Sequence, residues 1–223
     1  TAATAVRLVG NALAQTLTSG AGFDTLEGGA GNDVYRVNAG QDVVVEVAGG
    51  GTDTVVSTVS YTLAAAAQVE ALTSGSATAI RLVGNALAQT LTSGAGFDTL
   101  EGGAGNDTYR VNAGQDVVVE VAGGGTDTVV STVSYTLAAG ADVERLMGQS
   151  TTGLTLTGNA LNNELTGGAG EDTLIGGLGN DTYFLDTGAD MVVEAANQGI
   201  DRIYVRINYS LELAQNVEQL YAQ

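Results

Sequence analysis

Aspartates recur along the chain at the ends of short glycine-rich stretches. Residues 28–36 read GGAGNDVYR, and close copies read GGAGNDTYR at 102–110 and GGLGNDTYF at 176–184. Glycine permits backbone conformations that leave carbonyl oxygens uncovered, and carboxylate and carbonyl oxygens are the ligands that hard cations such as calcium take. These residue types at this spacing therefore predict sites for a hard cation.

The side chains that most enzymes use for catalysis are missing, since the sequence contains no His, Cys or Lys. Triads, zinc chemistry and Schiff bases are thereby excluded. A carboxylate pair could still hydrolyse a glycoside, but the repeating frame accounts for nearly every aspartate, so we expect no enzymatic activity. Two sets of recurring glutamates are interpreted as structural: Glu46, Glu120 and Glu194, and Glu70, Glu144 and Glu218. Three recurring tyrosines are expected in the core: Tyr35, Tyr109 and Tyr183.

The composition favours a cation as partner. The 223 residues include 25 acidic and 7 basic side chains, for a formal net charge of -18. Nucleic acid and anionic membrane surfaces are therefore excluded as partners, and no apolar run approaches the roughly 20 residues of a membrane helix. With 33 Gly and 44% hydrophobic residues, the chain resembles neither a helical bundle nor a disordered segment.

The chain consists of three copies of one unit. LVGNALAQTLTSG begins at Leu8 and again at Leu82, and LTGNALNNELTGG begins at Leu156, so the two intervals are equal. We therefore expect a single solenoid over 1–223, with repeats at about 6–79, 80–153 and 154–223. The third copy diverges, as a capping repeat would.

A shorter period of nine residues runs inside each unit. The sixth position of successive nonapeptides reads Gln15, Asp24, Asp33, Asp42 and Asp53. The eighth position is apolar or Tyr, which predicts a polar turn followed by a short strand with one buried side chain. Two turns and two strands, about 18 residues, would form one coil of a parallel β-solenoid, an all-β fold.

This arrangement predicts two stacks of carboxylates. Asp24 would lie over Asp42 and Asp33 over Asp53, on opposite edges and about 4.8 Å apart. Carboxylates at that distance repel each other unless a cation lies between them. The stacks therefore predict that the folded chain binds hard cations between its turns.

The nonapeptides resemble the G-G-x-G-x-D-x-U-x repeats of RTX proteins, also called haemolysin-type calcium-binding repeats. The longer frame, with GGGTDTVVSTVSYTL and the V-E-x-L tails, is similar to the extended repeats of large RTX exoproteins and of the R-modules of alginate epimerases. The resemblance covers essentially the whole chain. It implies a parallel β-roll, with calcium held between stacked turns. About two to three ions per unit would give roughly six to nine in all, which would offset about +12 to +18 of the acidic charge. We therefore expect the chain to be largely unfolded without calcium.

The resemblance also implies the ligands, which are aspartate side chains and the carbonyls of the glycine-rich turns. The aspartates are Asp24, Asp33, Asp42, Asp53, Asp98, Asp107, Asp116, Asp127, Asp172, Asp181, Asp190 and Asp201. The turn residues are Gly28, Ala30, Gly102, Ala104, Gly176 and Leu178, with Asn163 in place of an aspartate. Gln15 and Gln89 also replace aspartates, and we expect the first turn of each unit to bind its ion weakly.

Two functions from different classes fit these residues. The first is a calcium-stiffened scaffold, surface-layer or fibre-building unit of a secreted or cell-surface protein, with head-to-tail self-association. The second is an accessory module that aids export, folding or binding of an anionic polysaccharide by an attached enzyme or adhesin. Both would fold outside the cell, where calcium is abundant, and the resemblance implies type I secretion.

Overall fold

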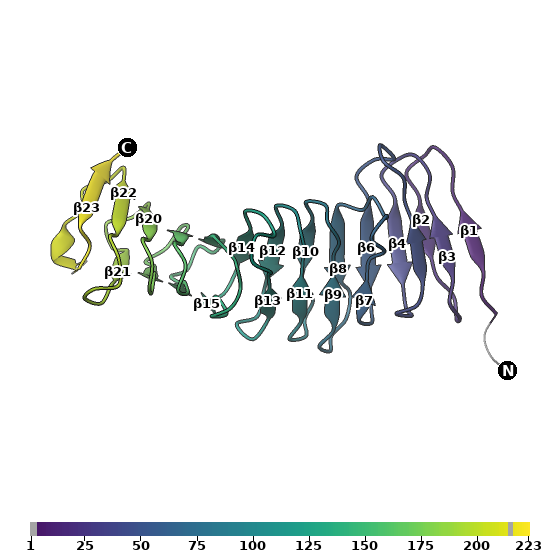
Figure 1. The fold of residues 1–223 in the computed structure, drawn as a ribbon, viewed down its shortest axis with the longest axis horizontal. Coiled ribbons are helices and arrows are strands. Elements are labelled where there is room, and N and C mark those ends of the chain that lie inside the picture. Colours follow the sequence, from purple (N-terminus) through teal and green to yellow (C-terminus); the bar gives the residue numbers. More distant parts are fainter. Residues whose placement is uncertain (1–3, 214–215) are drawn as a thin grey trace. The chain divides into compact units, whose positions relative to one another are not determined.

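The computed structural model describes residues 4–213 and 216–223, which form short strands joined by turns (Figure 1). Contacts divide the chain into two compact units, Thr1–Arg110 with Gln115–Gly125 and Val111–Gly114 with Thr126–Gln223. The prediction of a single solenoid with three repeat boundaries stays a prediction. The described part of the chain has no helix with the length and apolarity that a membrane crossing requires.

The strands of the first unit belong to two sets that alternate along the chain. The even-numbered strands are β2 (Thr16–Thr18), β4 (Val34–Val37), β6 (Thr54–Ser57), β8 (Ala71–Ser74), β10 (Thr90–Thr92) and β12 (Thr108–Val111). The odd-numbered strands are β1 (Arg7–Val9), β3 (Thr25–Glu27), β5 (Val43–Val45), β7 (Tyr61–Thr62), β9 (Arg81–Val83), β11 (Thr99–Glu101) and β13 (Val117–Val119). Even-numbered strands pair in the order β2-β4-β6-β8-β10-β12, and odd-numbered strands pair as β1-β3-β5 and β7-β9-β11-β13. The pairings are parallel, as in a coil that returns to the same sheet once per turn.

The second unit repeats this arrangement. One set comprises β14 (Thr128–Ser131), β16 (Arg145–Gly148), β18 (Glu164–Thr166), β20 (Thr182–Leu185), β22 (Arg202–Val205) and β23 (Gln219–Ala222), paired in that order. The other comprises β15 (Tyr135–Thr136), β17 (Thr155–Thr157), β19 (Thr173–Ile175) and β21 (Met191–Val193). A short 3-10 helix, η1 (Leu211–Leu213), precedes β23. The predicted all-β parallel solenoid is confirmed.

The strand register explains the length of the sequence repeat. Successive partners in the first sheet are Thr16, Val34, Thr54, Ala71 and Thr90. The four coils between these partners are unequal, and together they make one repeat. The coil from Val34 to Thr54 is the longest, because it contains the two extra residues Glu46 and Val47. The first coil has the expected length of about 18 residues, and the next three depart from it by one or two residues.

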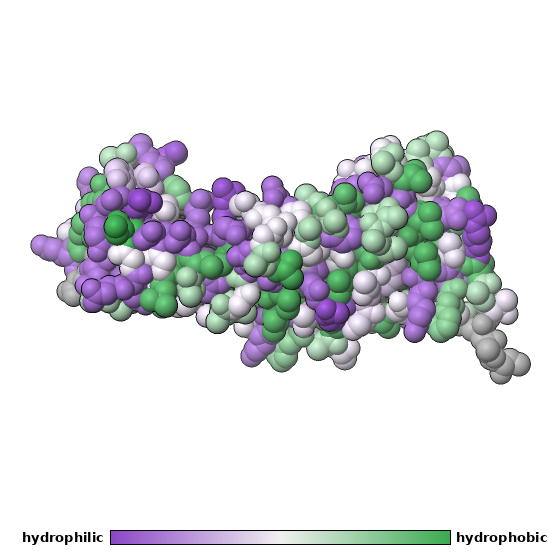
Figure 2. Space-filling model, in the orientation of Figure 1, coloured by the Kyte–Doolittle hydropathy of each residue, from purple (hydrophilic) through white to green (hydrophobic). Residues whose placement is uncertain are grey.

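The core lies between the two sheets of each unit and consists of the inward side chain of each strand. Leu26, Tyr35 and Val55 are fully buried, and Val44 is 1% exposed. Each occupies the eighth position of its nonapeptide, so the predicted inward position is confirmed. Outward side chains alternate with these buried ones along each strand. Hydrophobic and hydrophilic residues are therefore intermingled on the face that Figure 2 shows. Threonine and valine dominate the strands because β-branched side chains suit a pleated, half-buried surface.

Candidate metal sites

Every aspartate predicted as a ligand is buried, with at most 4% of its surface exposed. Those that precede odd-numbered strands are here called the A aspartates: Asp24, Asp42, Asp98, Asp116, Asp172 and Asp190. Those that precede even-numbered strands are the B aspartates: Asp33, Asp53, Asp107, Asp127, Asp181 and Asp201. A buried carboxylate is costly unless it is hydrogen-bonded and paired with a positive charge, so the partners of these oxygens decide what the turns can bind.

One oxygen of each stacked aspartate accepts a hydrogen bond from the neighbouring coil. The Asp24 N–H donates to Asp42 Oδ1 at 2.9 Å, and the Asp33 N–H donates to Asp53 Oδ1 at 2.7 Å. The Asp181 N–H donates to Asp201 Oδ1 at 2.8 Å in the second unit. The predicted stacking of Asp24 over Asp42 and of Asp33 over Asp53 is confirmed.

Most A aspartates differ from the B aspartates in the hydrogen bonds that their second oxygen, Oδ2, accepts. Asp24 Oδ2 accepts the N–H of Gly20 at 2.7 Å, which belongs to the same turn, and Asp98 Oδ2 accepts that of Gly94 in the same way. Asp42 and Asp190 are likewise bonded by amides of their own turns. The buried Oδ2 atoms of the B aspartates Asp33, Asp53 and Asp181 have no hydrogen-bond partner among the described residues. Asp172 is an A aspartate whose Oδ2 also lacks a partner.

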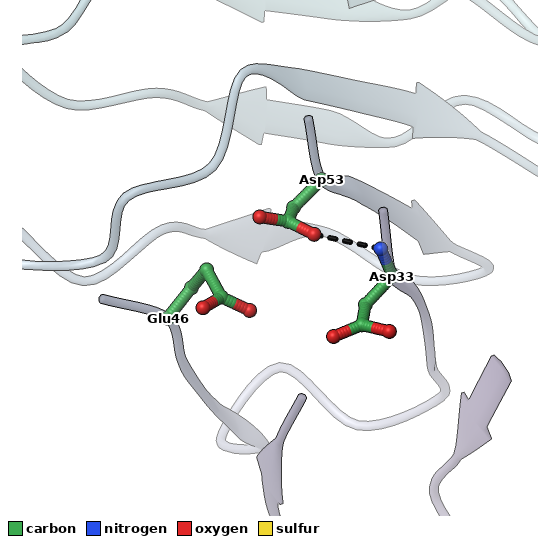
Figure 3. Close-up of side chains that lie close together, drawn as sticks. All are labelled: Asp33, Glu46 and Asp53. Carbon is green, nitrogen blue, oxygen red and sulfur yellow. Dashed lines mark hydrogen bonds between the residues drawn. The ribbon is translucent and has the colours of Figure 1, made fainter. Parts of the chain in front are cut away.

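A glutamate joins the B aspartates in each unit. Carboxylate oxygens of Asp33, Glu46 and Asp53 lie within 4.8 Å of one another, and Figure 3 shows Glu46 facing the two aspartates. Oxygens of Asp181, Glu194 and Asp201 form a similar group in the second unit. These two groups are here called the carboxylate triads. The second repeat has the equivalent residues in its sequence: Asp107, Glu120 and Asp127, all buried.

The glutamates of the triads were interpreted from sequence as structural residues. Glu46 is 3% exposed and reaches the aspartates from the two-residue insertion before β6. The signal that could have identified it is the recurrence of a glutamate at this insertion in all three repeats, at Glu46, Glu120 and Glu194. A nonapeptide pattern cannot include it, because the insertion interrupts the nine-residue period.

A tyrosine and a glycine hold the first triad in place. The Tyr35 hydroxyl donates to Glu46 Oε2 and accepts the N–H of Gly28 at 2.8 Å. A Cβ on Gly28 would overlap both Asp33 Oδ2 and the Tyr35 hydroxyl. The first glycine of this nonapeptide is therefore required because a carboxylate and a phenol occupy the space of its side chain. Tyr35 was predicted in the core, and its complete burial confirms this.

The second unit has the same arrangement around Gly176. A Cβ there would overlap the Tyr183 hydroxyl, Asp181 Oδ2 and Glu194 Oε1. The Tyr183 hydroxyl donates to Glu194 Oε1, and Glu194 Oε2 has no partner. Carboxylate oxygens and a phenol thus crowd the position that a side chain on residue 176 would occupy.

Burial raises the pKa values of carboxyl groups in the triads. It raises the pKa of Asp181 to about 7; the N–H of Asn163 opposes this rise, and the charges of Glu194 and Asp201 add to it. Burial also raises the pKa of Glu194 to about 7 and that of Asp53 to about 6. A fully ionised triad is thus unfavourable in the metal-free protein. The unpartnered oxygens and the three clustered carboxylates fit calcium, which binds six to eight oxygens.

The predicted carbonyl ligands lie in the turns beside these aspartates. Gly28 is buried, and its carbonyl oxygen faces the Cα of Gly10 in the preceding coil. Gly102 and Gly176 are buried at the equivalent positions. Three further predicted ligands are exposed at their turns: Ala30, Ala104 and Leu178. Ligation by these carbonyls stays a prediction.

Amide side chains stand where aspartates were expected in the first turn of each repeat. Gln89 Nε2 donates to the carbonyl of Val69 at 2.7 Å, and Asn163 Nδ2 donates to the carbonyl of Val143 at 2.8 Å. Asn163 Oδ1 accepts the N–H of Asn159 at 2.8 Å. The protein thus satisfies both ends of the Asn163 amide, and its role as a metal ligand stays a prediction.

A comparison with protein families agrees with this geometry. The model of the RTX calcium-binding nonapeptide repeat, which describes four copies, matches residues 9–44, 83–118 and 157–192. No curated protein matched the chain. RTX repeats imply calcium binding and are typical of secreted proteins. The chain therefore carries several copies of the RTX calcium-binding nonapeptide repeat.

Proposed function

We propose that the chain is a structural module that folds when it binds extracellular calcium. The observation that carries this proposal is the set of buried carboxylate oxygens without partners, on Asp33, Asp53 and Asp181 in particular. Without a cation, folding would bring these charges together in a low-dielectric interior, which costs several kcal/mol per unpaired ion. A metal that binds only the folded chain supplies folding free energy directly.

A secreted or cell-surface location supports this mechanism. Extracellular calcium modules bind at roughly 0.1 to 1 mM, a concentration that the cytosol does not reach. The chain would stay unfolded inside the cell and fold after export, as the typical secretion of RTX repeat proteins suggests. Export through a type I system belongs to the same proposal.

Within this class we favour a scaffold over an enzyme. Two nearly identical repeats and a parallel β-core build a stiff, repetitive element, and the sequence lacks His, Cys and Lys. Glu46 accepts hydrogen bonds from the Tyr35 hydroxyl and the Val47 N–H, and the carboxylates of Asp33, Glu46 and Asp53 face one another. Their geometry suits an ion more than a substrate.

An accessory module that binds an anionic polysaccharide is the second candidate. Arg36 on β4 is exposed, and among the described residues it makes no ion pair. It borders a shallow pocket of about 200 Å³ lined also by Thr18 and Val56. Loss of alginate binding in an Arg36→Gln variant would favour this candidate.

A calcium titration followed by circular dichroism and light scattering tests the proposal. The β-signal should rise cooperatively with calcium, and a mass that grows with folding would support a self-associating building unit. Folding at constant mass would favour the accessory module. A β-rich spectrum in excess chelator, unchanged by calcium, would contradict calcium-dependent folding in either form.

A further inference from the structure

We propose that Glu46 and Glu194 are calcium ligands, and that the carboxylate triads are the tightest calcium sites of the chain. This inference rests on the proposed calcium-dependent function. It goes beyond the nonapeptide, since Glu46 and Asp53 lie after the first matched segment, 9–44, and Glu194 and Asp201 lie after the third, 157–192.

The first argument is the number of free acceptors that converge on each triad. In the second unit, Asp181 Oδ2 and Glu194 Oε2 are buried and have no partner, and both residues are at least nine-tenths buried. In the first unit, Asp33 Oδ2 and Asp53 Oδ2 are in the same state. A native interior rarely leaves such atoms unsatisfied, so these oxygens require a cation or protons.

The second argument is the contrast with the A aspartates. Asp24 Oδ2 receives the N–H of Gly20, and Asp42 Oδ2 receives those of Asn38 and Ala39. These two carboxylates are satisfied as turn caps and gain less from an ion. Asp33, Asp53 and Asp181 have no such partner at Oδ2 and have a glutamate beside them, whereas Asp172, the A aspartate with an unpartnered Oδ2, is not part of a carboxylate triad.

The third argument is charge. A triad holds three carboxylates, whereas a stacked pair of aspartates holds two, and calcium affinity in proteins rises with the charge of the ligand set and the rigidity of the site. The hydroxyls of Tyr35 and Tyr183 fix the orientation of Glu46 and Glu194 through hydrogen bonds. The two-residue insertion provides the extra length that brings Glu46 to the aspartates.

The tyrosines also provide the readout. The chain has no Trp, so its near-ultraviolet absorption comes mainly from Tyr, and the hydroxyls of Tyr35 and Tyr183 touch the triads directly. Terbium in a triad should therefore luminesce when tyrosine is excited. The test compares Glu46→Gln and Glu194→Gln in the full chain with Glu27→Gln, a matched loss of one charge at a glutamate that pairs with exposed Arg7.

Each triad variant should lose one tight binding event in calcium calorimetry, with affinity at that site about tenfold lower or worse, and should show weaker tyrosine-sensitised terbium luminescence. Glu27→Gln should bind like the parent. If the parent binds calcium and the triad variants match it in both measurements, the inference is overturned while the proposed function stands. If the parent itself does not respond to calcium, the proposed function fails first.

Folding of the variants is a separate readout. If Glu46→Gln loses β-structure at the calcium concentration that just saturates the parent and regains it at a higher one, a ligand role is supported, because mass action restores a weakened site. If it stays unfolded at every calcium concentration while Glu27→Gln folds, Glu46 is a structural residue and the inference is wrong. Glu194→Gln repeats this test in the second compact unit.

Discussion

Replacing Gly28 with alanine should destabilise the calcium-loaded protein strongly. Gly28 does not have a positive φ, so the backbone itself would accept alanine. The obstacle is space, because the new Cβ would overlap Asp33 Oδ2 and the Tyr35 hydroxyl. One of these groups must move, and both belong to the surroundings of the first triad.

The size of the effect follows from the bonds that such a movement breaks. Displacing the Tyr35 hydroxyl removes its bond from the Gly28 N–H and its bond to the Glu46 carboxylate. A neutral hydrogen bond contributes about 0.5–1.5 kcal/mol and one to a charged group about 1.5–3 kcal/mol. We therefore expect Gly28→Ala to lower the free energy of unfolding by about 2–4 kcal/mol.

Urea unfolding followed by circular dichroism in saturating calcium measures this loss. The matched control is Gly140→Ala, since a Cβ on Gly140 meets no atom within 4 Å and its φ is not positive. The control should leave stability unchanged or raise it by about 0.4–1 kcal/mol. A Gly28→Ala protein as stable as the control would refute the steric account of the first glycine.

Three further outcomes follow from the structure. Lowering the pH from about 8 to 6 should weaken calcium binding, because Asp181 and Glu194, with pKa values of about 7, must lose their protons to bind the ion; calorimetry at the two pH values measures this. In the metal-free chain, stability should change with pH in the opposite direction. A raised folded-state pKa stabilises the fold below the unfolded pKa of about 4, and this stabilisation is lost as the pH rises through about 7. A β-signal in chelator that increases with pH would contradict the raised pKa values of Asp181 and Glu194. Tyr183→Phe should cost about 1–3 kcal/mol in urea unfolding, because it removes the hydroxyl donor of buried Glu194, and an unchanged midpoint would show that this bond contributes nothing. Arg7→Gln should change stability by less than about 1 kcal/mol, since the Arg7 side chain is 64% exposed, and a larger loss of thermal stability would mean that the first coil depends on this ion pair.

Much of the fold could be predicted from local signals. The eighth nonapeptide position marked Leu26, Tyr35 and Val55 as inward residues, and all three are fully buried. The lengths of the coils from Thr54 to Ala71 and from Ala71 to Thr90 could not be predicted in this way. These coils include segments after β6, where the glycine-aspartate pattern stops and nothing in the sequence marks where the next coil closes.

The candidate site was predicted in part. The stacking of Asp33 over Asp53 follows from the nine-residue period together with the two extra residues Glu46 and Val47, and it is present as the bond from the Asp33 N–H to Asp53 Oδ1. The difference between the A and B aspartates was not predictable, because both precede strands and follow similar turns. It depends on which amides point at the second oxygen, and that is set by the local path of each turn.

Local sequence is enough to predict the repeat, the alternation of turn and strand, the inward side chains and the aspartates that stack, because each of these depends on residues close together in the chain. The position of Glu46 opposite Asp33 and Asp53, and its contact with Tyr35 beside Gly28, become visible only in the folded chain. Contacts between coils depend on coil length and register, which no single nonapeptide specifies. The insertion of Glu46 and Val47 changes both, and it brings the Glu46 carboxylate to the aspartates. In the sequence it appears only as an interruption of the nine-residue pattern.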